Sequence, residues 1–337
     1  MKKILLPLLL LGAAFTLWAA AVPGYHLLKQ YKLGGEGGWD YLTFDAAGNR
    51  LFIARATRMM VVDPDSGKLL AEIPDTAGVH GIALADDLGK GFISDGGDNA
   101  VTVIDLKTLK AIGEKIPVGK GPDAILYDTA SHRVFTFNHK GGDSTVLDAA
   151  SGKVLATIPL EGKPEFAAAD GKGRAWVNLE DKSEIVELDT NKLAVVQHWP
   201  LAPCEAPTGL AFDARNRRLF AGCDNKLMAV MDADSGKVIT TLPIGAGVDA
   251  AGFDPGTKMA FASNGQSGTL TVVHEDSADK FTVVENVETA KNARTMTVDP
   301  KTHRIFLVTA EVEAPKNPGE RRHVVPDTFQ VLVVGTK

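Results

Sequence analysis

Residues 208–245 read TGLAFDARNRRLFAGCDNKLMAVMDADSGKVITTLPIG, the cleanest copy of a unit that the chain repeats. Four short apolar runs alternate in it with polar clusters: 208–212, 218–223, 227–232 and 237–242. Ala-Asp-Ser-Gly joins the last two runs, and these residue types favour tight turns. The pattern therefore predicts four β-strands in one small antiparallel sheet.

The unit recurs along the chain at a nearly constant spacing. An aspartate follows the first run of each copy, at intervals of 41, 42, 42, 43, 41 and 45 residues: Asp45, Asp86, Asp128, Asp170, Asp213, Asp254 and Asp299. A second aspartate closes the third run: Asp63, Asp105, Asp148, Asp189, Asp232 and Asp276. Repeats of about 40–45 residues with four strands each are typical of β-propeller blades. The sequence predicts an all-β protein, a seven-bladed β-propeller of four-stranded antiparallel blades.

Two other repeat architectures fit less well. A β-solenoid has much shorter repeats and lacks the hairpin turns. WD40-like blades have the right length, but their Gly-His and Trp-Asp markers are absent except for the isolated pair Trp39-Asp40.

Two segments carry a resemblance to a known repeat family. Residues 101–128, VTVIDLKTLKAIGEKIPVGKGPDAILYD, and 133–138, RVFTFN, resemble the YVTN-type, YncE-like seven-bladed β-propeller repeat. The tetrapeptide that names this family survives as FTFN at 135–138 and FASN at 261–264. The resemblance covers almost all of residues 22–337 and implies the propeller fold. It implies little about activity because the family has mixed functions.

The seventh copy lacks a fourth run. Its predicted strands are 294–298, 304–309 and 328–334. The missing outer strand is expected from residues 25–34, YHLLKQYKLG, at the other end of the chain. This pairing would close the ring and leave no open edge between blades, so residues 22–337 should form one domain.

Residues 1–21 have the features of a cleaved secretory signal peptide. Lys2 and Lys3 precede an apolar run that ends in three alanines at 19–21. A retained membrane anchor is the alternative, but the run is short and ends in an A-x-A pattern. No later apolar run approaches the ~20 residues of a spanning helix. We expect a periplasmic or secreted protein.

Export bears on the two cysteines, Cys204 and Cys223. An even count in an exported chain favours a disulfide, whereas the alternative is two buried free thiols. There is no CxxC redox pair and no CxxCH haem-attachment motif.

The net charge of the chain indicates which classes of partner it can bind. The chain has 36 basic and 42 acidic residues, and without Lys2 and Lys3 the balance is 34 against 42, a net charge of −8. Similarity to YncE-like proteins implies nucleic acid as one partner, but nucleic-acid and anionic-membrane binding need basic faces. The acidic balance argues against both partners.

Candidate site residues follow from aligning the copies. In a propeller the first strand of each blade lines the central channel, and one residue near its start lies at the mouth. Seven residues occupy this ring position: Asp40, His80, Asp123, Glu165, Thr208, Asp249 and Arg294. Polar lining of a wet channel is the simplest interpretation, but four carboxylates are more than solvation requires.

Crowded carboxylates repel one another, so some should have raised pKa values or hold a cation. Oxygen ligands suit Ca²⁺ or Mg²⁺, and the histidine would admit a transition ion. The metal-ligand set would be Asp40, His80, Asp123, Glu165 and Asp249.

A second set of residues is expected on the same face, from the loops between second and third strands: Arg55, Arg58, Asp95, Asn138, His139, Glu180, Asn264 and Glu311. The largest of these loops is 311–326, EVEAPKNPGERRHVVP. Long loops in compact domains are often functional. Its Arg321, Arg322 and His323 could fold over the mouth as a lid, or extend into solvent.

Catalytic motifs are absent: there is no G-x-S-x-G elbow, HExxH motif or P-loop. We therefore expect a monomeric, non-catalytic binding or scaffold propeller that holds a small ligand, a cation or an envelope protein at the mouth. The alternative is a lactonase-like hydrolase or lyase with His80 as general base or metal ligand. A third function, as a quinone-dependent dehydrogenase or electron-transfer subunit, would need haem-binding cysteines or a redox-active aromatic site, and the sequence shows neither. Blade five, with Thr208 and both cysteines, should brace the site without being its chemical centre.

Overall fold

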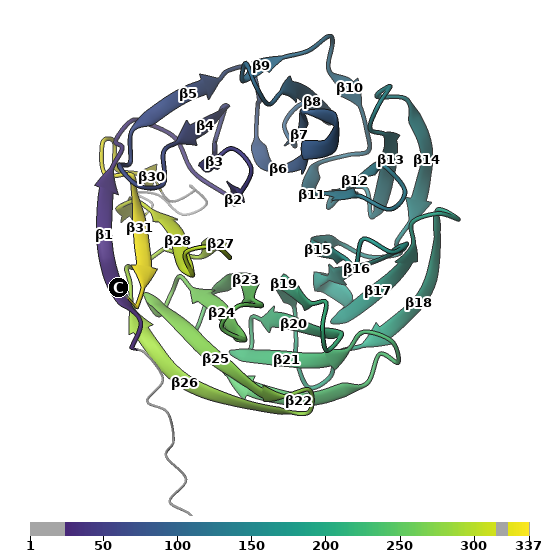
Figure 1. Ribbon diagram of the computed structural model, residues 1–337. Coiled ribbons are helices and arrows are strands. Elements are labelled where there is room, and N and C mark those ends of the chain that lie inside the picture. Colours follow the sequence, from purple (N-terminus) through teal and green to yellow (C-terminus); the bar gives the residue numbers. More distant parts are fainter. Residues whose placement is uncertain (1–23, 315–322, 337) are drawn as a thin grey trace, which may run out of the picture.

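Residues 24–314 and 323–336 are described by the computed structural model, and they form seven small antiparallel sheets in a ring (Figure 1). Outside the strands, regular structure in these residues is limited to two 3₁₀ turns, η1 (Asp86–Leu88) and η2 (Glu180–Lys182). The predicted all-β, seven-bladed propeller is confirmed. The expected signal peptide at 1–21 lies outside the described residues.

Six blades follow the chain in order from the inner to the outer strand. Blade 1 contains β2 (Leu42–Asp45), β3 (Arg50–Arg55), β4 (Arg58–Val62) and β5 (Leu69–Ile73). Blade 2 contains β6 (Val79–Ala85), β7 (Lys90–Asp95), β8 (Ala100–Asp105), β9 (Lys110–Ala111) and β10 (Ile116–Pro117). Blade 3 contains β11 (Pro122–Asp128), β12 (Arg133–Asn138), β13 (Asp143–Asp148) and β14 (Val154–Pro159). Blade 4 contains β15 (Pro164–Ala169), β16 (Arg174–Leu179), β17 (Glu184–Asp189) and β18 (Ala194–Pro200). Blade 5 contains β19 (Pro207–Asp213), β20 (Arg218–Cys223), β21 (Leu227–Asp232) and β22 (Val238–Pro243). Blade 6 contains β23 (Val248–Asp254), β24 (Met259–Asn264), β25 (Thr269–Ser277) and β26 (Lys280–Glu288).

Blade 7 closes the ring with both ends of the domain. Its strands, from inside to outside, are β27 (Thr295–Asp299), β28 (Arg304–Thr309), β31 (Gln330–Gly335) and β1 (His26–Lys32). Strand β1 pairs antiparallel with β31 from His26–Gly335 to Lys32–Gln330. The predicted closure is confirmed, and it leaves blade 7 with a paired outer strand.

Blade 2 departs from the regular pattern. Its outer strand is broken into β9 and β10, which pair with opposite halves of β8. Residues 112–115 bulge out between them, although the Ile112 amide still donates to the Val103 carbonyl at 2.8 Å.

The recurring aspartates have a local structural role. The Asp232 carboxylate accepts from the backbone amides of Asp234 and Ser235 at 3.1 and 2.9 Å. Asp63 and Asp148 accept from Ser66 and Ser151 in the same way. These Asx contacts add to the backbone hydrogen bonds of the tight turn, and the following glycine takes a positive φ, 69° at Gly236. This turn chemistry explains the period of the sequence.

The core lies between blades because both faces of each sheet pack against neighbouring sheets. Phe220 of blade 5, for example, stacks on Phe253 of blade 6 with ring centroids 5.2 Å apart. The middle strands are accordingly buried along most of their length, as in β20. No helix among the described residues is long and apolar enough to cross a membrane.

Candidate functional site

The ring residues are presented to the mouth by a shared irregularity of the backbone. In blades 2 to 6 each one lies where the first strand shifts register against the second, between Val79 and Ile82 in blade 2 and at the equivalent positions of the next four blades. Bulges of this kind re-aim a side chain. In blade 1, Asp40 lies two residues before the first strand, and in blade 7, Arg294 directly precedes the first strand.

His80 lies between two carboxylates from neighbouring blades. Its Nδ1 forms a short hydrogen bond with Asp40 Oδ2 and lies 3.5 Å from Asp123 Oδ1. Burial on its own would lower the pKa of His80, but the Asp40 hydrogen bond and the charges of Asp123, Asp40 and Glu165 outweigh it and raise the pKa to about 9. At neutral pH the His80 imidazole is therefore protonated.

Arg294 joins the other side of Asp40 to blade 6. Its Nε donates to Asp249 Oδ2 at 2.6 Å, and its Nη2 lies 3.7 Å from Asp40 Oδ1. Burial raises the pKa of the Asp249 carboxyl, and the Arg294 charge partly offsets that effect. Asp40 is thus shared between an imidazolium and a guanidinium.

A second cluster of ligand-type groups extends from Asp123 to blade 4. His139 Nδ1 lies 2.8 Å from Glu165 Oε1, and the hydroxyl of Tyr41 donates to Glu165 Oε2 at 3.4 Å. Burial raises the pKa of Asp123, and the nearby carboxylates of Asp40, Glu165 and Asp249 add to the shift against the opposing His80 charge. The pKa of buried Tyr41 is also raised well above its usual value, by burial and by the same acids. Tyr41 therefore remains a hydrogen-bond donor.

Two triads have the geometry of a metal site. Asp40, His80 and Asp123 form one, and Asp123, His139 and Glu165 form the other; within each triad one ligand atom per residue lies within 4.8 Å of the others. Asp123 belongs to both. Asp123 Oδ1 and His139 Nδ1 are buried without a partner in hydrogen-bond geometry among the described residues. Imidazole and carboxylate donors together fit a divalent transition ion.

Of the remaining predicted ring residues, Thr208 and Asp249 stand outside these triads. Thr208 Oγ1 donates to the Val248 carbonyl at 3.0 Å, and Asp249 is paired with Arg294. The predicted disulfide between Cys204 and Cys223 is confirmed, with Cα atoms 5.7 Å apart. His139 was expected only in the second set, and the structure adds it to the cluster.

Part of the second set is buried, which corrects the expectation that these side chains open on the face. Arg55, Asp95, Asn138 and Asn264 have no exposed surface. The Arg55 guanidinium lies 3.8 Å above the Phe329 ring and donates to the Gly37 carbonyl at 2.7 Å. Asn138 and Asn264 donate to side chains of their own hairpins, Asp143 and Thr271. These side chains fold back to hold loops, whereas Glu311 is exposed.

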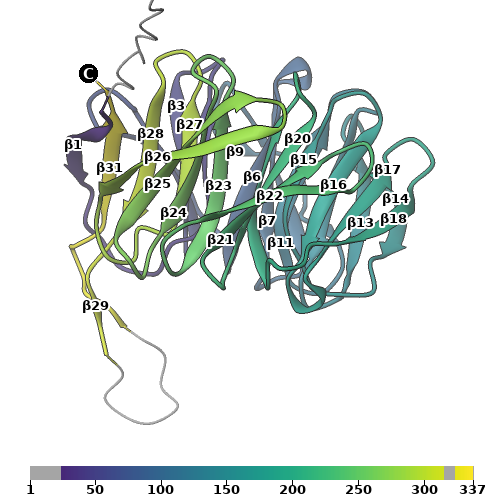
Figure 2. The same ribbon diagram turned by 90° about the horizontal axis from the view of Figure 1, so that it is seen from below.

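The large loop of blade 7 begins and ends as a β-ribbon. Strands β29 (Val312–Glu313) and β30 (His323–Val324) pair antiparallel, and the ribbon projects from one face of the ring (Figure 2). His323 is exposed, and Arg321 and Arg322 lie outside the described residues. A lid role for this loop stays a prediction.

A cavity of about 610 Å³ adjoins Arg294. It lies among the starts of blades 6, 7 and 1 and the ribbon, and its lining is Gly38, Trp39, Asp224, Gly247, Val248, Asp249, Gly265, Gln266, Asn292, Arg294, Val312 and Val324. The lining combines an indole, a guanidinium, two side-chain amides and a rim with several glycines. This composition suits a small polar ligand.

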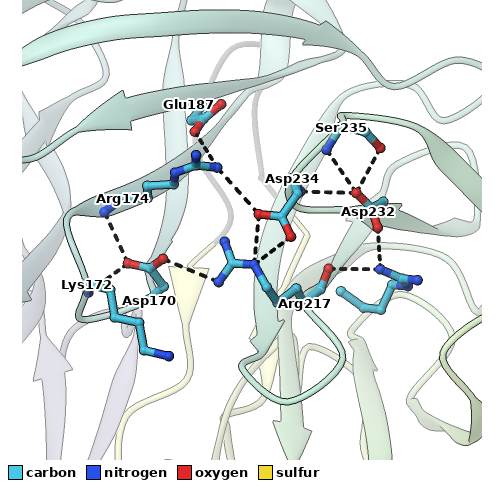
Figure 3. Close-up of polar contacts among 9 residues, drawn as sticks. Asp170, Lys172, Arg174, Glu187, Arg217, Asp232, Asp234 and Ser235 are labelled. Carbon is cyan, nitrogen blue, oxygen red and sulfur yellow. Dashed lines mark hydrogen bonds and ion pairs between the residues drawn. The ribbon is translucent and has the colours of Figure 1, made fainter.

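A charged network at the opposite ends of the strands has a structural role. Figure 3 shows Arg217 between Asp170 and Asp234, and Arg174 between Glu187 and Asp234. Every charge in this network has an opposite charge beside it, and the pairs link blade 4 to blade 5. It provides matched control positions for experiments on the mouth.

Comparisons with known proteins agree with the fold. No family model matches the chain. Two curated relatives, each described as "Uncharacterized protein YncE" and found in Salmonella typhi and Salmonella typhimurium, are 24% identical over 193 residues, which is 55% of this chain and 54% of each relative. The match thus spans about half the length of these relatives.

Solved structures share the architecture at low identity. A chain of the "Crystal Structure of Mitotic Checkpoint Complex" matches with a TM-score of 0.76 and 12% identity over 99% of both chains. The "Crystal structure of RRP9 WD40 repeats" matches with a TM-score of 0.74 and 9% identity, over 92% of this chain and 97% of that one. At such identities the likeness shows the fold alone.

Proposed function

We propose that this chain, a YncE-like seven-bladed β-propeller, is an exported binding protein that holds a divalent transition-metal ion at its channel mouth. The observation that carries the proposal is the convergence of four ligand-type side chains on the Asp123 carboxylate. Together with Asp123, the set drawn from blades 1 to 4 is Asp40, His80, Asp123, His139 and Glu165.

An unpartnered carboxylate oxygen favours an ion over a self-sufficient set of ion pairs. Asp123 Oδ1 is buried and lacks a hydrogen bond in the described part of the chain, and the His80 Nδ1 atom lies 3.5 Å away. A buried polar atom left in this state costs about 1–3 kcal/mol. A cation bound between the two triads would satisfy this atom.

The donor set decides the kind of ion. Ca²⁺ and Mg²⁺ bind oxygen ligands, whereas two imidazoles among three carboxylates suit Zn²⁺, Mn²⁺ or related ions. The channel-mouth position leaves coordination positions open to small molecules, which is consistent with a binding role.

A titration of chelator-treated protein with Zn²⁺, Mn²⁺ and Ca²⁺ tests the proposal. We expect one Zn²⁺ or Mn²⁺ per chain, weaker Ca²⁺ binding, and a loss of about tenfold or more in affinity for Asp123→Asn. Asp234→Asn is the matched control because Asp234 is a paired carboxylate in the opposite network. Absence of binding, or an equal effect of both substitutions, would overturn the proposal.

Metal-assisted lactone hydrolysis is the second candidate, because His80 and Asp40 form the hydrogen-bonded pair that a general base needs. The raised pKa of His80 opposes that role at neutral pH, since a protonated imidazole cannot accept a proton. Assays of the Zn²⁺-loaded protein on simple lactones separate the two functions. The binding role predicts hydrolysis no faster than with Asp123→Asn.

A further inference from the structure

The cavity beside Arg294 offers hydrogen-bond donors that nothing in the described residues occupies. Arg294 uses Nε and Nη2 for Asp249, Trp39 and Asp40, while its Nη1 has no partner among residues 24–314 and 323–336. The indole Nε1 of Trp39, a side chain only 7% exposed, also lacks a partner there. The side-chain amides of Gln266 and Asn292 line the same space.

The acidic groups near the cavity are mostly engaged already. Asp249 accepts from Arg294, and Asp40 is held by His80 and Arg294. Asp224 is exposed at the rim, where water screens its charge. The charged group left to recognise a ligand is therefore the Arg294 guanidinium, a donor that requires acceptor oxygens, and the amides of Gln266 and Asn292 can donate as well as accept.

We propose that the cavity binds a small carboxylate that pairs with Arg294, next to the cation held by the neighbouring triad. The inference rests on the proposed function, since Asp40 belongs to that triad and lies 3.7 Å from Arg294 Nη2. A planar guanidinium matches a carboxylate with two parallel hydrogen bonds. Val312 and Val324 of the ribbon would cover the apolar part of the ligand.

Cavity size limits the ligand to a small molecule. A volume of about 610 Å³ lies within the range of ordinary small-molecule sites, about 300–1,000 Å³. A dicarboxylate with a short carbon chain would fill part of it and leave room for water or substituents.

Charge makes carboxylate binding depend on the cation. Without an ion, the mouth holds the carboxylates of Asp40, Asp123, Glu165 and Asp249 against the charges of Arg294, His80 and His139. A bound divalent ion adds two positive charges close to the cavity, but each protonated imidazole that becomes a ligand releases its proton, so the net gain in positive charge is smaller than two. The remaining gain weakens the repulsion of a carboxylate ligand. Binding free energies are reciprocal, so the carboxylate should tighten the ion by the same factor.

Calorimetry with three probes of equal chain length tests the inference: succinate, 1,4-diaminobutane and 1,4-butanediol. With Zn²⁺-saturated protein, we expect succinate to bind, about tenfold or more tightly than to the chelator-treated protein, and the diamine and diol not to bind. Arg294→Gln should weaken succinate binding by about tenfold or more while Zn²⁺ still binds. Arg174→Gln, in the network of Figure 3, should leave both affinities unchanged.

Retained Zn²⁺ binding shows that the Arg294 variant is folded. If Arg294→Gln does not fold, Arg294→Lys keeps the charge, and the loss of the planar fork should still weaken succinate binding. Binding of the diamine, or succinate binding that Arg294 substitutions leave unchanged, would overturn the inference. A protein that binds Zn²⁺ but not succinate contradicts this inference alone, whereas a protein that binds no cation contradicts the proposed function.

Discussion

The His80 imidazole and the Asp40 carboxylate form a hydrogen bond across the boundary of blades 1 and 2, with a sequence separation of 40 residues. The two residues occupy the same position in consecutive repeats. Their contact therefore depends on the closed ring and on the register shift at His80 that turns its side chain inward. It links the chemistry of the mouth to the stability of the fold.

The first prediction concerns stability and pH. The pKa of His80 is raised from 6.5 to about 9 in the folded protein. A raised pKa means that the folded state binds the proton more tightly, so this stabilisation is fully present below pH 6.5 and is lost as the pH rises through 9. We expect a loss of about 2 kcal/mol from this group, reduced from the full shift because its side chain is 34% exposed.

Urea denaturation of chelator-treated protein at several pH values between about 6 and about 9.5 measures this loss of unfolding free energy. The window begins near the ordinary pKa of an imidazole and ends just above the raised pKa of His80. In His80→Asn the decline over this window should be smaller by about this amount, and the raised pKa values of Asp123 and Asp249 should leave a residual decline. His132→Asn, in an exposed turn, is the control and should keep the wild-type profile. An unchanged decline in His80→Asn would show that another group is responsible.

The second prediction separates backbone strain from packing. Gly236 has φ 69° and a Cβ there would collide with the Trp199 ring, whereas Gly113 has φ 68° and open space around it. Gly113→Ala should cost about 1 kcal/mol of unfolding free energy from strain, and Gly236→Ala about 3 kcal/mol from strain and overpacking. Equal costs in thermal or urea unfolding would contradict the packing argument.

The third prediction concerns the disulfide of blade 5. Cys204 and Cys223 close a loop with a sequence separation of 19 residues. Replacing both by serine should lower the unfolding free energy by about 3 kcal/mol. Zn²⁺ affinity should change little, since Thr208 of the same blade stands outside both triads. A large loss of Zn²⁺ binding in a folded double variant would assign blade 5 a role in the site.

The fourth prediction concerns export. Residues 1–21 should be removed when the full chain is expressed in a Gram-negative host, and the protein should fractionate with the periplasm. Intact-mass measurement of the purified protein locates the new N-terminus, which we expect at or near residue 22. A full-length chain in the cytoplasmic fraction would disprove the expectation.

The fold could be predicted from the sequence because its markers have local causes. Aspartates equivalent to Asp232 accept in the same kind of Asx turn in blades 1 to 4, so the period of these aspartates is the period of the blades. The ring residues could be predicted by alignment for the same reason. The broken outer strand of blade 2 was missed because Asp105 and Asp128 have the same spacing as Asp63 and Asp86 in blade 1, so the markers give no sign of the break at 112–115.

The exposure of single polar residues could not be predicted. Arg55, Asn138 and Asn264 end second strands, and they turn inward to satisfy loop carbonyls or neighbouring side chains. His139 turns toward Glu165 of the next blade instead. Sequence position gives the end of a strand, whereas the direction of a side chain there depends on its contacts within the hairpin or with another blade.

The most direct test of the central claim is anomalous diffraction at the zinc edge from crystals of the chain soaked in Zn²⁺. The proposed function predicts a strong peak at the mouth, about 2.0–2.2 Å from Asp123 and from at least one of His80 and His139. The peak should be absent in Asp123→Asn. A map with no peak at the mouth, or with peaks only at exposed histidines such as His132, would contradict it.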